Sequence, residues 1–210
     1  MPESVPRYQD MGDGITAIDT DLLRPMFDAS HLLVENGRAA FIDCGVNDSV
    51  PLLLATLKRK NIDVADVDYL FLTHVHLDHA GGAGALMEAL PNAQAVLHPR
   101  GAPHMIDPAR LIKGAQAVYG EKEYFRQYGD IRPISKDRVI VAEDRQEFSF
   151  GGRRLTSVYT EGHARHHHCF ADPGARAVFT GDSFGLSYRE LDTPSGEFIY
   201  PTTTPVHFDT

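Results

Sequence analysis

Residues 73–79 read Thr-His-Val-His-Leu-Asp-His and come directly after a short apolar run of strand type. His74 and His76 lie on either side of one residue, so both imidazoles are expected to point the same way. Asp78 and His79 follow in the turn that enters the next helix. Because imidazole nitrogens and carboxylate oxygens are the usual ligands of catalytic zinc, this dense cluster predicts a metal site. The alternative is a polar surface loop in which Asp78 only caps the helix.

Apolar residues at helical spacing predict helices on both sides of this cluster. One amphipathic helix is expected over residues 48–60, with Asn47 or Asp48 as its cap. A second is expected after the cluster, where apolar residues recur at helical spacing over residues 83–90. Residues 101–130 have mixed helical character and several Tyr and Phe side chains. This stretch interrupts the alternation of strands and helices and is a candidate lid.

Short apolar runs bounded by Gly, Pro, Asn or Asp predict strands along most of the chain. The dipeptide Asn36-Gly37 predicts a tight hairpin, so the chain is expected to open with antiparallel sheet. The predicted strands cover residues 14–19, 30–35, 39–44, 69–72, 93–98, 139–142, 146–150, 155–159, 168–171 and 177–180. Sheets with helices outside them favour an α+β fold built as a four-layer αββα sandwich, although periodicity alone supports only a mixed α/β or α+β class.

Length and composition favour one globular domain over residues 1–210. The chain has 210 residues, enough for one sizeable core, and shows no repeat, linker or low-complexity tract. Its formal net charge of -9 would repel the phosphates of nucleic acid, and no basic stripe extends beyond the three residues at 58–60. We therefore expect a small-molecule substrate and no nucleic-acid partner, and we leave the oligomeric state open.

Cysteine usage and the N-terminal segment bear on the cellular compartment. Cys44 and Cys169 form no C-x-x-C pair, so they predict buried free thiols rather than a zinc ribbon or a redox dithiol. Residues 1–19 lack a basic segment followed by an apolar run, so we expect no signal peptide. No stretch is long and apolar enough to span a membrane, so we expect no membrane partner and a cytoplasmic location.

The segment His74-x-His76-x-Asp78-His79, followed by Ala-Gly-Gly, resembles the metal-binding signature of the metallo-β-lactamase superfamily. The resemblance continues over most of the chain through three further segments. These are Phe-Ile-Asp-Cys-Gly at 41–45, Thr-Glu-Gly-His at 160–163 and Phe-Thr-Gly-Asp at 179–182. The resemblance implies the αββα sandwich and a metal-dependent hydrolase of the glyoxalase II-like or lactonase-like branch.

The same resemblance implies how the ligands divide between two zinc-like ions. It assigns His74, His76 and His163 to a first ion, Asp78 and His79 to a second, and Asp182 to a bridge between them. The cofactor is expected to be one or two zinc ions, with iron or manganese as alternatives. In the family the second ion also takes a late histidine, and His207 is the only histidine after Asp182. We therefore expect a C-terminally truncated chain whose second site lacks a ligand, with His207 a weak substitute.

Other polar residues near these segments are expected to support the site rather than bind metal. The histidine run at 166–168 is interpreted as support for the ligands. By the resemblance, the carboxylate of Asp43 holds the metal loop; the alternative is a plain turn aspartate. His31, His98 and His104 are predicted to be ordinary core or surface histidines.

The predicted mechanism needs no Ser or Cys nucleophile. A metal ion lowers the pKa of its bound water towards about 7, so hydroxide is available to attack a carbonyl or phosphoryl centre. Asp78 and Asp182 are predicted to orient this hydroxide, and one of them to receive its proton. The aromatic stretch at 119–128 is a candidate wall of the substrate pocket, and a plain packing helix is the equal alternative.

Three function classes follow from these residues. The first is hydrolysis of an ester, thioester or lactone, as in the branches that the motif resembles. The second is an iron-dependent oxidoreductase similar to the persulfide dioxygenase branch, because two His and one Asp can hold a single iron. The third is a nuclease or a non-catalytic relative. The acidic charge counts against a nuclease, and the intact ligand set counts against a non-catalytic module.

Overall fold

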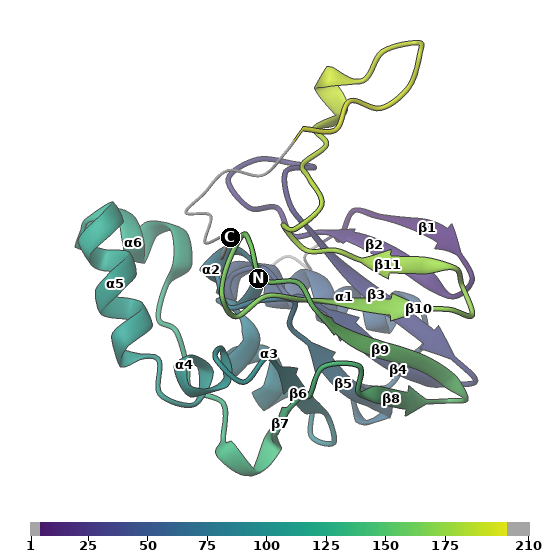
Figure 1. Ribbon diagram of the computed structural model, residues 1–210, viewed down its shortest axis with the longest axis horizontal. Coiled ribbons are helices and arrows are strands. Elements are labelled where there is room, and N and C mark those ends of the chain that lie inside the picture. Colours follow the sequence, from purple (N-terminus) through teal and green to yellow (C-terminus); the bar gives the residue numbers. More distant parts are fainter. Residues whose placement is uncertain (1–4, 201–210) are drawn as a thin grey trace.

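Two facing β-sheets form the centre of the computed structural model, which describes residues 5–200 (Figure 1). The first sheet has seven strands in chain order: β1 (Tyr8–Gly12), β2 (Ile15–Asp19), β3 (Ala29–Glu35), β4 (Arg38–Ile42), β5 (Val67–Phe71), β6 (Gln94–Leu97) and β7 (Val139–Val141). The second has four strands in the order β11-β10-β9-β8: β8 (Glu147–Phe150), β9 (Arg153–Tyr159), β10 (His168–Asp172) and β11 (Ala177–Phe179). The α+β class is confirmed.

Strand direction changes at β4 within the first sheet. The strands from β1 to β4 pair antiparallel, whereas β4, β5, β6 and β7 pair parallel. The turn between β3 and β4 places Asn36 and Gly37 at φ of 47° and 78°, a left-handed conformation that these two residues tolerate. The predicted hairpin and antiparallel opening are therefore confirmed. Parallel neighbours need crossover connections, which the helices supply.

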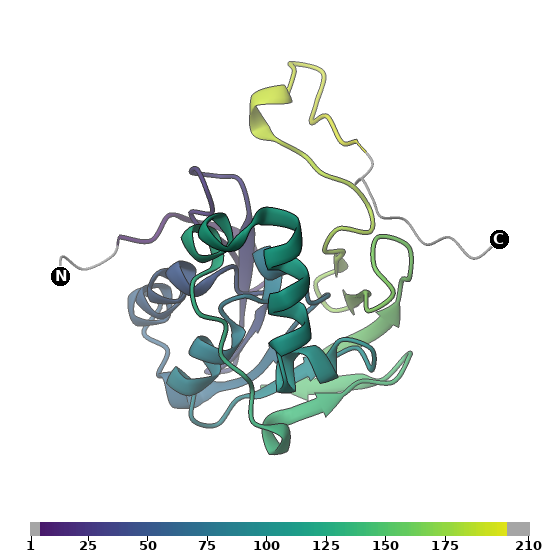
Figure 2. The same ribbon diagram turned by 90° about the vertical axis from the view of Figure 1, so that its left-hand side faces the viewer.

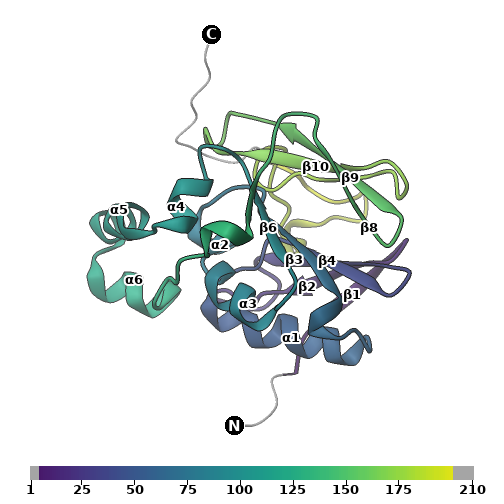
Figure 3. The ribbon, with the colours of Figure 1, turned by 90° about the horizontal axis from the view of Figure 1, so that it is seen from below.

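The α-helices within residues 5–200 all precede the second sheet. They are α1 (Val50–Arg59), α2 (Leu77–Ala80), α3 (Ala83–Ala89), α4 (Ala102–Ile106), α5 (Ala109–Tyr119) and α6 (Glu121–Tyr128). Figure 3 shows α1 and α3 covering the outer face of the first sheet. Figure 3 shows the layers of the described chain in the order helix, sheet and sheet, with no described α-helix over the outer face of the second sheet.

The core between α1 and the first sheet follows the periodicity of the sequence. Leu53 and Leu57 of α1 share a buried cluster with Phe41 of β4 and Leu70 of β5. The next residue of β4, Ile42, belongs instead to the cluster between the two sheets. Because β4 is buried on both faces, its sequence is almost continuously apolar rather than alternating.

Aromatic rings fill the space between the two sheets. The ring centroid of Phe71 in β5 lies 5.5 Å from that of Phe148 in β8 and 4.9 Å from that of Phe170 in β10. Tilted and edge-on pairs of this kind add to the burial of apolar area. They hold the second sheet against β5, the strand that ends just before the histidine cluster.

The helices α5 and α6 form a hairpin beside the sheets (Figures 1 and 2). Tyr124 and Tyr128 of α6 are buried against Leu22 and Val46 in a small cluster of their own. The helical character predicted for residues 101–130 is confirmed.

Local details at two places differ from the prediction. Neither Asn47 nor Asp48 caps α1, because the residue at the cap position is Ser49, whose side chain makes no capping hydrogen bond. The amide of Asn47 instead donates to the carbonyls of Tyr128 and Asp130, at 2.8 Å and 2.9 Å. The sequence pattern also does not predict β1, because all its residues are exposed and show no apolar alternation.

The remaining general predictions concern thiols, membranes and domains. Cys44 and Cys169 are free and buried, as predicted. Within the described residues, no helix combines the length and apolar character needed to cross a membrane. The single domain over residues 1–210 stays a prediction.

Candidate metal centre

The candidate ligands come from separate segments that the fold gathers at one end of the sheets. They are His74 and His76 after β5, Asp78 and His79 within α2, His163 between β9 and β10, and Asp182 after β11. His76 and His163 are in contact although 87 positions separate them. The packing of one sheet on the other is what brings the two segments together.

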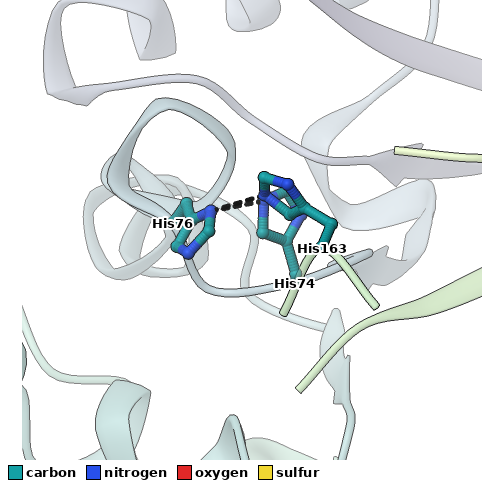
Figure 4. Close-up of side chains that lie close together, drawn as sticks. All are labelled: His74, His76 and His163. Atoms are coloured by element: carbon teal, nitrogen blue, oxygen red, sulfur yellow. Dashed lines mark hydrogen bonds between the residues drawn. The ribbon is translucent and has the colours of Figure 1, made fainter. Parts of the chain in front are cut away.

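The ring nitrogens of His74, His76 and His163 converge (Figure 4). Nδ1 of His76 lies 3.0 Å from Nε2 of His74 and 2.8 Å from Nε2 of His163. One ligand atom of each residue lies within 4.8 Å of the other two. The three residues predicted to hold the first ion therefore form one group.

A second group adjoins the first and consists of His74, His79 and Asp182. Nε2 of His79 lies 3.2 Å from Oδ1 of Asp182, and the other oxygen of that carboxylate lies 3.6 Å from Nε2 of His163. Asp182 therefore contacts His79 of its own group and His163 of the first group, and its role as a bridge between two ions stays a prediction. Oδ2 of Asp78 is more distant, 3.9 Å from Nε2 of His79.

Burial and mutual proximity favour neutral imidazoles in the first group. Burial lowers the pKa of His74 well below its ordinary value, and the neighbouring histidines lower it further. Burial is also the main cause that lowers the pKa of His76 and of His163. A neutral imidazole keeps the lone pair with which it binds a metal ion.

His79 has the opposite electrostatic environment. Burial acts to lower its pKa, but the carboxylates of Asp78, Asp182 and Asp43 together raise it well above the ordinary value. Burial likewise acts to raise the pKa of Asp182, but the hydrogen bond with His79 and the nearby imidazoles lower it overall. The carboxylates therefore favour a positive charge here, as a cation site requires.

The donor set and its spacing fit a zinc-like ion. Tetrahedral zinc holds its nitrogen ligands roughly 3.3 Å apart, and the ring nitrogens of the first group are 3.0 Å and 2.8 Å apart. A proton between two imidazoles satisfies only one pair of nitrogens. A single metal ion satisfies all three lone pairs at once.

Asp43 lies behind the ligand loop and contacts two of its residues. It accepts hydrogen bonds from the backbone N and from Oγ1 of Thr73. Its Oδ2 also lies 3.0 Å from Nδ1 of His79, whose Nε2 faces Asp182. The structure thus places Asp43 where a supporting carboxylate is needed, since such contacts orient metal ligands.

Two side chains of the histidine run at 166–168, His166 and His168, contact neighbouring backbone. The backbone N–H of Val75 donates to Nδ1 of His166 at 3.4 Å. His168 is fully buried, and its Nε2 lies 2.7 Å from the carbonyl oxygen of Leu72. None of the three histidines belongs to either ligand group found among residues 5–200. The geometry agrees with a supporting role.

A cavity of about 530 Å³ opens beside the ligand groups and is lined in part by α5. Tyr119 and Tyr128 line it, whereas Tyr124 is buried in the packing of α6. The aromatic stretch therefore serves both as wall and as packing helix. His104, predicted to be an ordinary histidine, also lines the cavity.

The candidate lid over residues 101–130 includes α5, but the sequence alone does not assign the cavity wall that this helix contributes. Arg110, Leu111, Gly114 and Val118 line the cavity, and they recur at helical spacing on one face of α5. This periodicity is the signal that could have found them, although it does not tell which buried neighbour the face meets. His207 lies outside the described residues, so its predicted role is not described.

A comparison of sequences identifies the family. The family model for the metallo-β-lactamase superfamily matches residues 24–209. The chain belongs to the metallo-β-lactamase superfamily. This confirms the resemblance seen in the motif at 74–79, and the histidine-rich groups of the described chain lie in a fold that typically binds metal ions.

Similar proteins support the same fold. A metallo-β-lactamase fold-containing protein of Sulfurisphaera tokodaii is 31% identical over 169 residues, which are 79% of this chain and 57% of that protein. The crystal structure of this same archaeal protein, from Sulfolobus tokodaii, has a TM-score of 0.72 and 26% identity, covering 94% of this chain and 72% of that one. A metallo-β-lactamase from Legionella gormanii, 20% identical with a TM-score of 0.61, covers 82% of this chain and 59% of its own and shows the fold alone.

Relatives with named activities are matched over shorter lengths. The atrochrysone carboxyl ACP thioesterase of Aspergillus fumigatus is 30% identical over 117 residues, 56% of this chain and 27% of that protein. The N-acyl homoserine lactonase of Azorhizobium caulinodans is 30% identical over 118 residues, 56% of this chain and 40% of that protein. The chain thus spans between 27% and 57% of the length of the curated relatives named here. At the level of the family, these comparisons support a metal-dependent hydrolase.

Proposed function

We propose that this protein is a metal-dependent hydrolase that attacks an ester, thioester or lactone with a metal-activated water. The observation that carries the proposal is the convergence of His74, His76 and His163 beside Asp182 at a cavity of about 530 Å³. Ligands that border a cavity leave a coordination position open, as catalytic zinc sites do and structural ones do not. The thioesterase and lactonase relatives are named for the hydrolysis of a thioester and of a lactone, which supports this choice of scissile bond.

The two carboxylates have distinct places in this proposal. When bound, a zinc-like ion supplies a Lewis acid and lowers the pKa of water. The side chain of Asp78 is 41% exposed and lines the cavity, so it is placed to accept a proton from the attacking water. The side chain of Asp182 is less exposed and lies between His79 and His163. Its proposed role is to orient the attacking water, whereas Asp78 accepts the proton.

The cysteines do not offer a competing nucleophile. Burial raises the pKa of the Cys44 thiol well above its ordinary value, which disfavours the reactive thiolate. In the described chain, neither Cys44 nor Cys169 lines the cavity that holds the ligand candidates. Water is therefore the nucleophile of the proposed reaction.

Metal analysis and hydrolysis assays test the proposal. Protein purified anaerobically without chelators is expected to carry about one to two equivalents of zinc, iron or manganese. The zinc-loaded protein should hydrolyse a thioester or a lactone. His76→Ala should lose both the metal and the turnover while circular dichroism shows a retained fold, because an open catalytic site need not hold the fold together. Retained metal and turnover in His76→Ala would contradict the ligand assignment.

A different outcome would favour the oxidoreductase alternative. Iron as the bound metal, together with oxygen consumption on a persulfide and no hydrolysis, would overturn the hydrolase proposal.

Cytoplasmic location stays a prediction from the sequence, and fractionation of the producing cells measures it.

A further inference from the structure

One face of α5 forms a side wall of the cavity next to the candidate metal centre. The residues of this face are Arg110, Leu111, Gly114, Ala115, Val118 and Tyr119. They follow the helical repeat and therefore lie in one stripe along the helix. At a rise of about 1.5 Å per residue the stripe is roughly 13 Å long, enough to lie along an acyl chain of several carbons.

Arg110 places an exposed positive charge at one end of this stripe. No carboxylate of residues 5–200 forms an ion pair with it. It also lies in the first turn of α5, where the helix dipole disfavours a cation. Neither an ion pair within residues 5–200 nor the helix dipole stabilises the positive charge of Arg110. Its guanidinium is therefore available to a ligand in the cavity. Its planar fork matches a carboxylate through two parallel hydrogen bonds.

The middle of the stripe is apolar and has open space. Leu111, Ala115 and Val118 line the cavity between Arg110 and the end of α5. A Cβ added at Gly114 would meet no atom within 4 Å, so a ligand has room at this position. An apolar wall with one charged group at its end is the arrangement by which pockets orient small amphipathic ligands.

We propose that the cavity selects acyl substrates that carry a carboxylate at the end remote from the reacting carbonyl, and that Arg110 recognises this carboxylate. The reacting carbonyl lies at the ligand groups beside Asp182, and the methylene chain lies over Gly114. The inference rests on the proposed function for the reaction itself. Recognition of the carboxylate is a binding property, however, and is measured without turnover.

The experiment compares two amides that differ only in the terminal carboxylate. Zinc-loaded protein is titrated calorimetrically with 6-amino-6-oxohexanoate and with hexanamide, in which the amide replaces the hydrolysable group. We expect the carboxylate to tighten binding about tenfold, the range of a charge-assisted hydrogen bond, and this advantage to shrink as ionic strength rises. Arg110→Gln is expected to abolish the advantage.

Lys113→Gln is the matched control for the change of charge. Lys113 is an exposed cation on the same helix and does not line the cavity, so this variant should keep the tenfold advantage. Three results would overturn the proposal: no binding of 6-amino-6-oxohexanoate, equal affinities for the two amides, or equal losses in Arg110→Gln and Lys113→Gln.

Two further probes separate other sources of binding. Hexanoate tests direct binding of a carboxylate to the metal ion. The proposal would be overturned if hexanoate bound as tightly as 6-amino-6-oxohexanoate and if Arg110→Gln did not change the affinity for hexanoate. The phosphonate analogue 5-phosphonopentanamide tests the anion. A stronger preference for it that depends on Arg110 would overturn the assignment of a carboxylate.

Gly114→Leu tests the path of the acyl chain independently of charge. Leucine favours a helix more than glycine does, so the variant should fold and retain zinc. Its side chain fills the space beside the chain and should weaken binding of both amides about fivefold. Unchanged affinities would overturn the placement over Gly114.

The proposed function and this inference can fail separately. A protein that hydrolyses neither thioester nor lactone, yet shows the preference that depends on Arg110, overturns the proposed function alone. A protein that hydrolyses them without that preference overturns this inference alone.

Discussion

Thr73 donates two hydrogen bonds to the carboxylate of Asp43, from its backbone N to Oδ1 at 2.8 Å and from its Oγ1 to Oδ2 at 2.7 Å. Thr73 immediately precedes His74, and Asp43 immediately follows β4. The contact therefore joins two parallel strands at the point where the ligand loop begins. Because Nδ1 of His79 lies 3.0 Å from the same Oδ2, one buried carboxylate positions both ends of that loop.

Replacement of Asp43 is expected to weaken both the fold and the metal site. Asp43→Ala leaves the buried donors of Thr73 unpaired, so the free energy of unfolding should fall by about 2–4 kcal/mol. Zinc affinity should fall roughly 10- to 100-fold, because the support of His79 is lost. Asp43→Asn retains the size and one acceptor, so it should cost less stability while still weakening zinc binding. Urea unfolding of the zinc-free protein and competitive zinc titration measure these effects, and unchanged zinc affinity in both variants would contradict the role of Asp43.

Two zinc ions are expected to bind with unequal affinity. His74 belongs to both candidate groups, but its Nδ1 lies 3.1 Å from Oγ1 of Thr73, so only its Nε2 is left for a metal. The ligands predicted for the second ion among the described residues are then three: Asp78, His79 and Asp182. Calorimetric titration of zinc into the metal-free protein should show one tight and one weaker site. Two equally tight sites, both lost in His207→Ala, would show instead that His207 completes the centre.

Gly181 is expected to tolerate no side chain. Its φ is 46°, and an added Cβ would lie 2.6 Å from Oγ1 of Thr73 and 2.8 Å from Nε2 of His167. Gly181→Ala should lower the free energy of unfolding by about 2–3 kcal/mol and weaken zinc binding, because the neighbouring Asp182 is displaced. Gly37→Ala is the matched control, since Gly37 also has a positive φ of 78° but no atom within 4 Å of an added Cβ. It should cost only about 1 kcal/mol; equal costs with unchanged zinc affinity would refute the steric argument.

His168 is expected to make the stability depend on pH. It is fully buried between the carbonyl oxygen of Leu72 and Oγ of Ser157, and burial lowers its pKa from 6.5 to about 4. The unfolded chain takes up a proton at this group near pH 6.5, whereas the folded protein does so only near pH 4. The contribution to stability is therefore complete above pH 6.5 and is lost as the pH falls towards 4. Between pH 8 and pH 5.5 the loss is about 1.4 kcal/mol.

His168→Gln removes this titration and retains a donor for the carbonyl of Leu72. Urea unfolding of the zinc-free protein at pH 8 and pH 5.5 should show a dependence on pH that is smaller by about 1.4 kcal/mol in the variant. The same dependence in both proteins would show that another group causes it.

Sequence alone determined the features that depend on residues close together in the chain. The dipeptide Asn36-Gly37 predicts the hairpin because only its own backbone must adopt positive φ. The apolar run that becomes β4 predicts a strand, because a strand that is buried on both faces has a nearly continuous apolar sequence. The ligands at 74–79 could be predicted because their residue types and spacing carry the chemistry of metal binding.

The family resemblance assigns His163 and Asp182 to the site, but only the tertiary structure shows how these distant segments reach the ligand loop. Contact between His76 and His163 depends on the second sheet packing against Phe71, and no local periodicity encodes a contact over 87 positions. The same holds for α5, whose apolar face is visible in the sequence, whereas its position beside the ligands depends on the packing of Tyr124 and the rest of the α5–α6 hairpin. The physical reason is that hydrophobic burial is not directional: it requires that an apolar face be covered, but shape and connectivity select the surface that covers it.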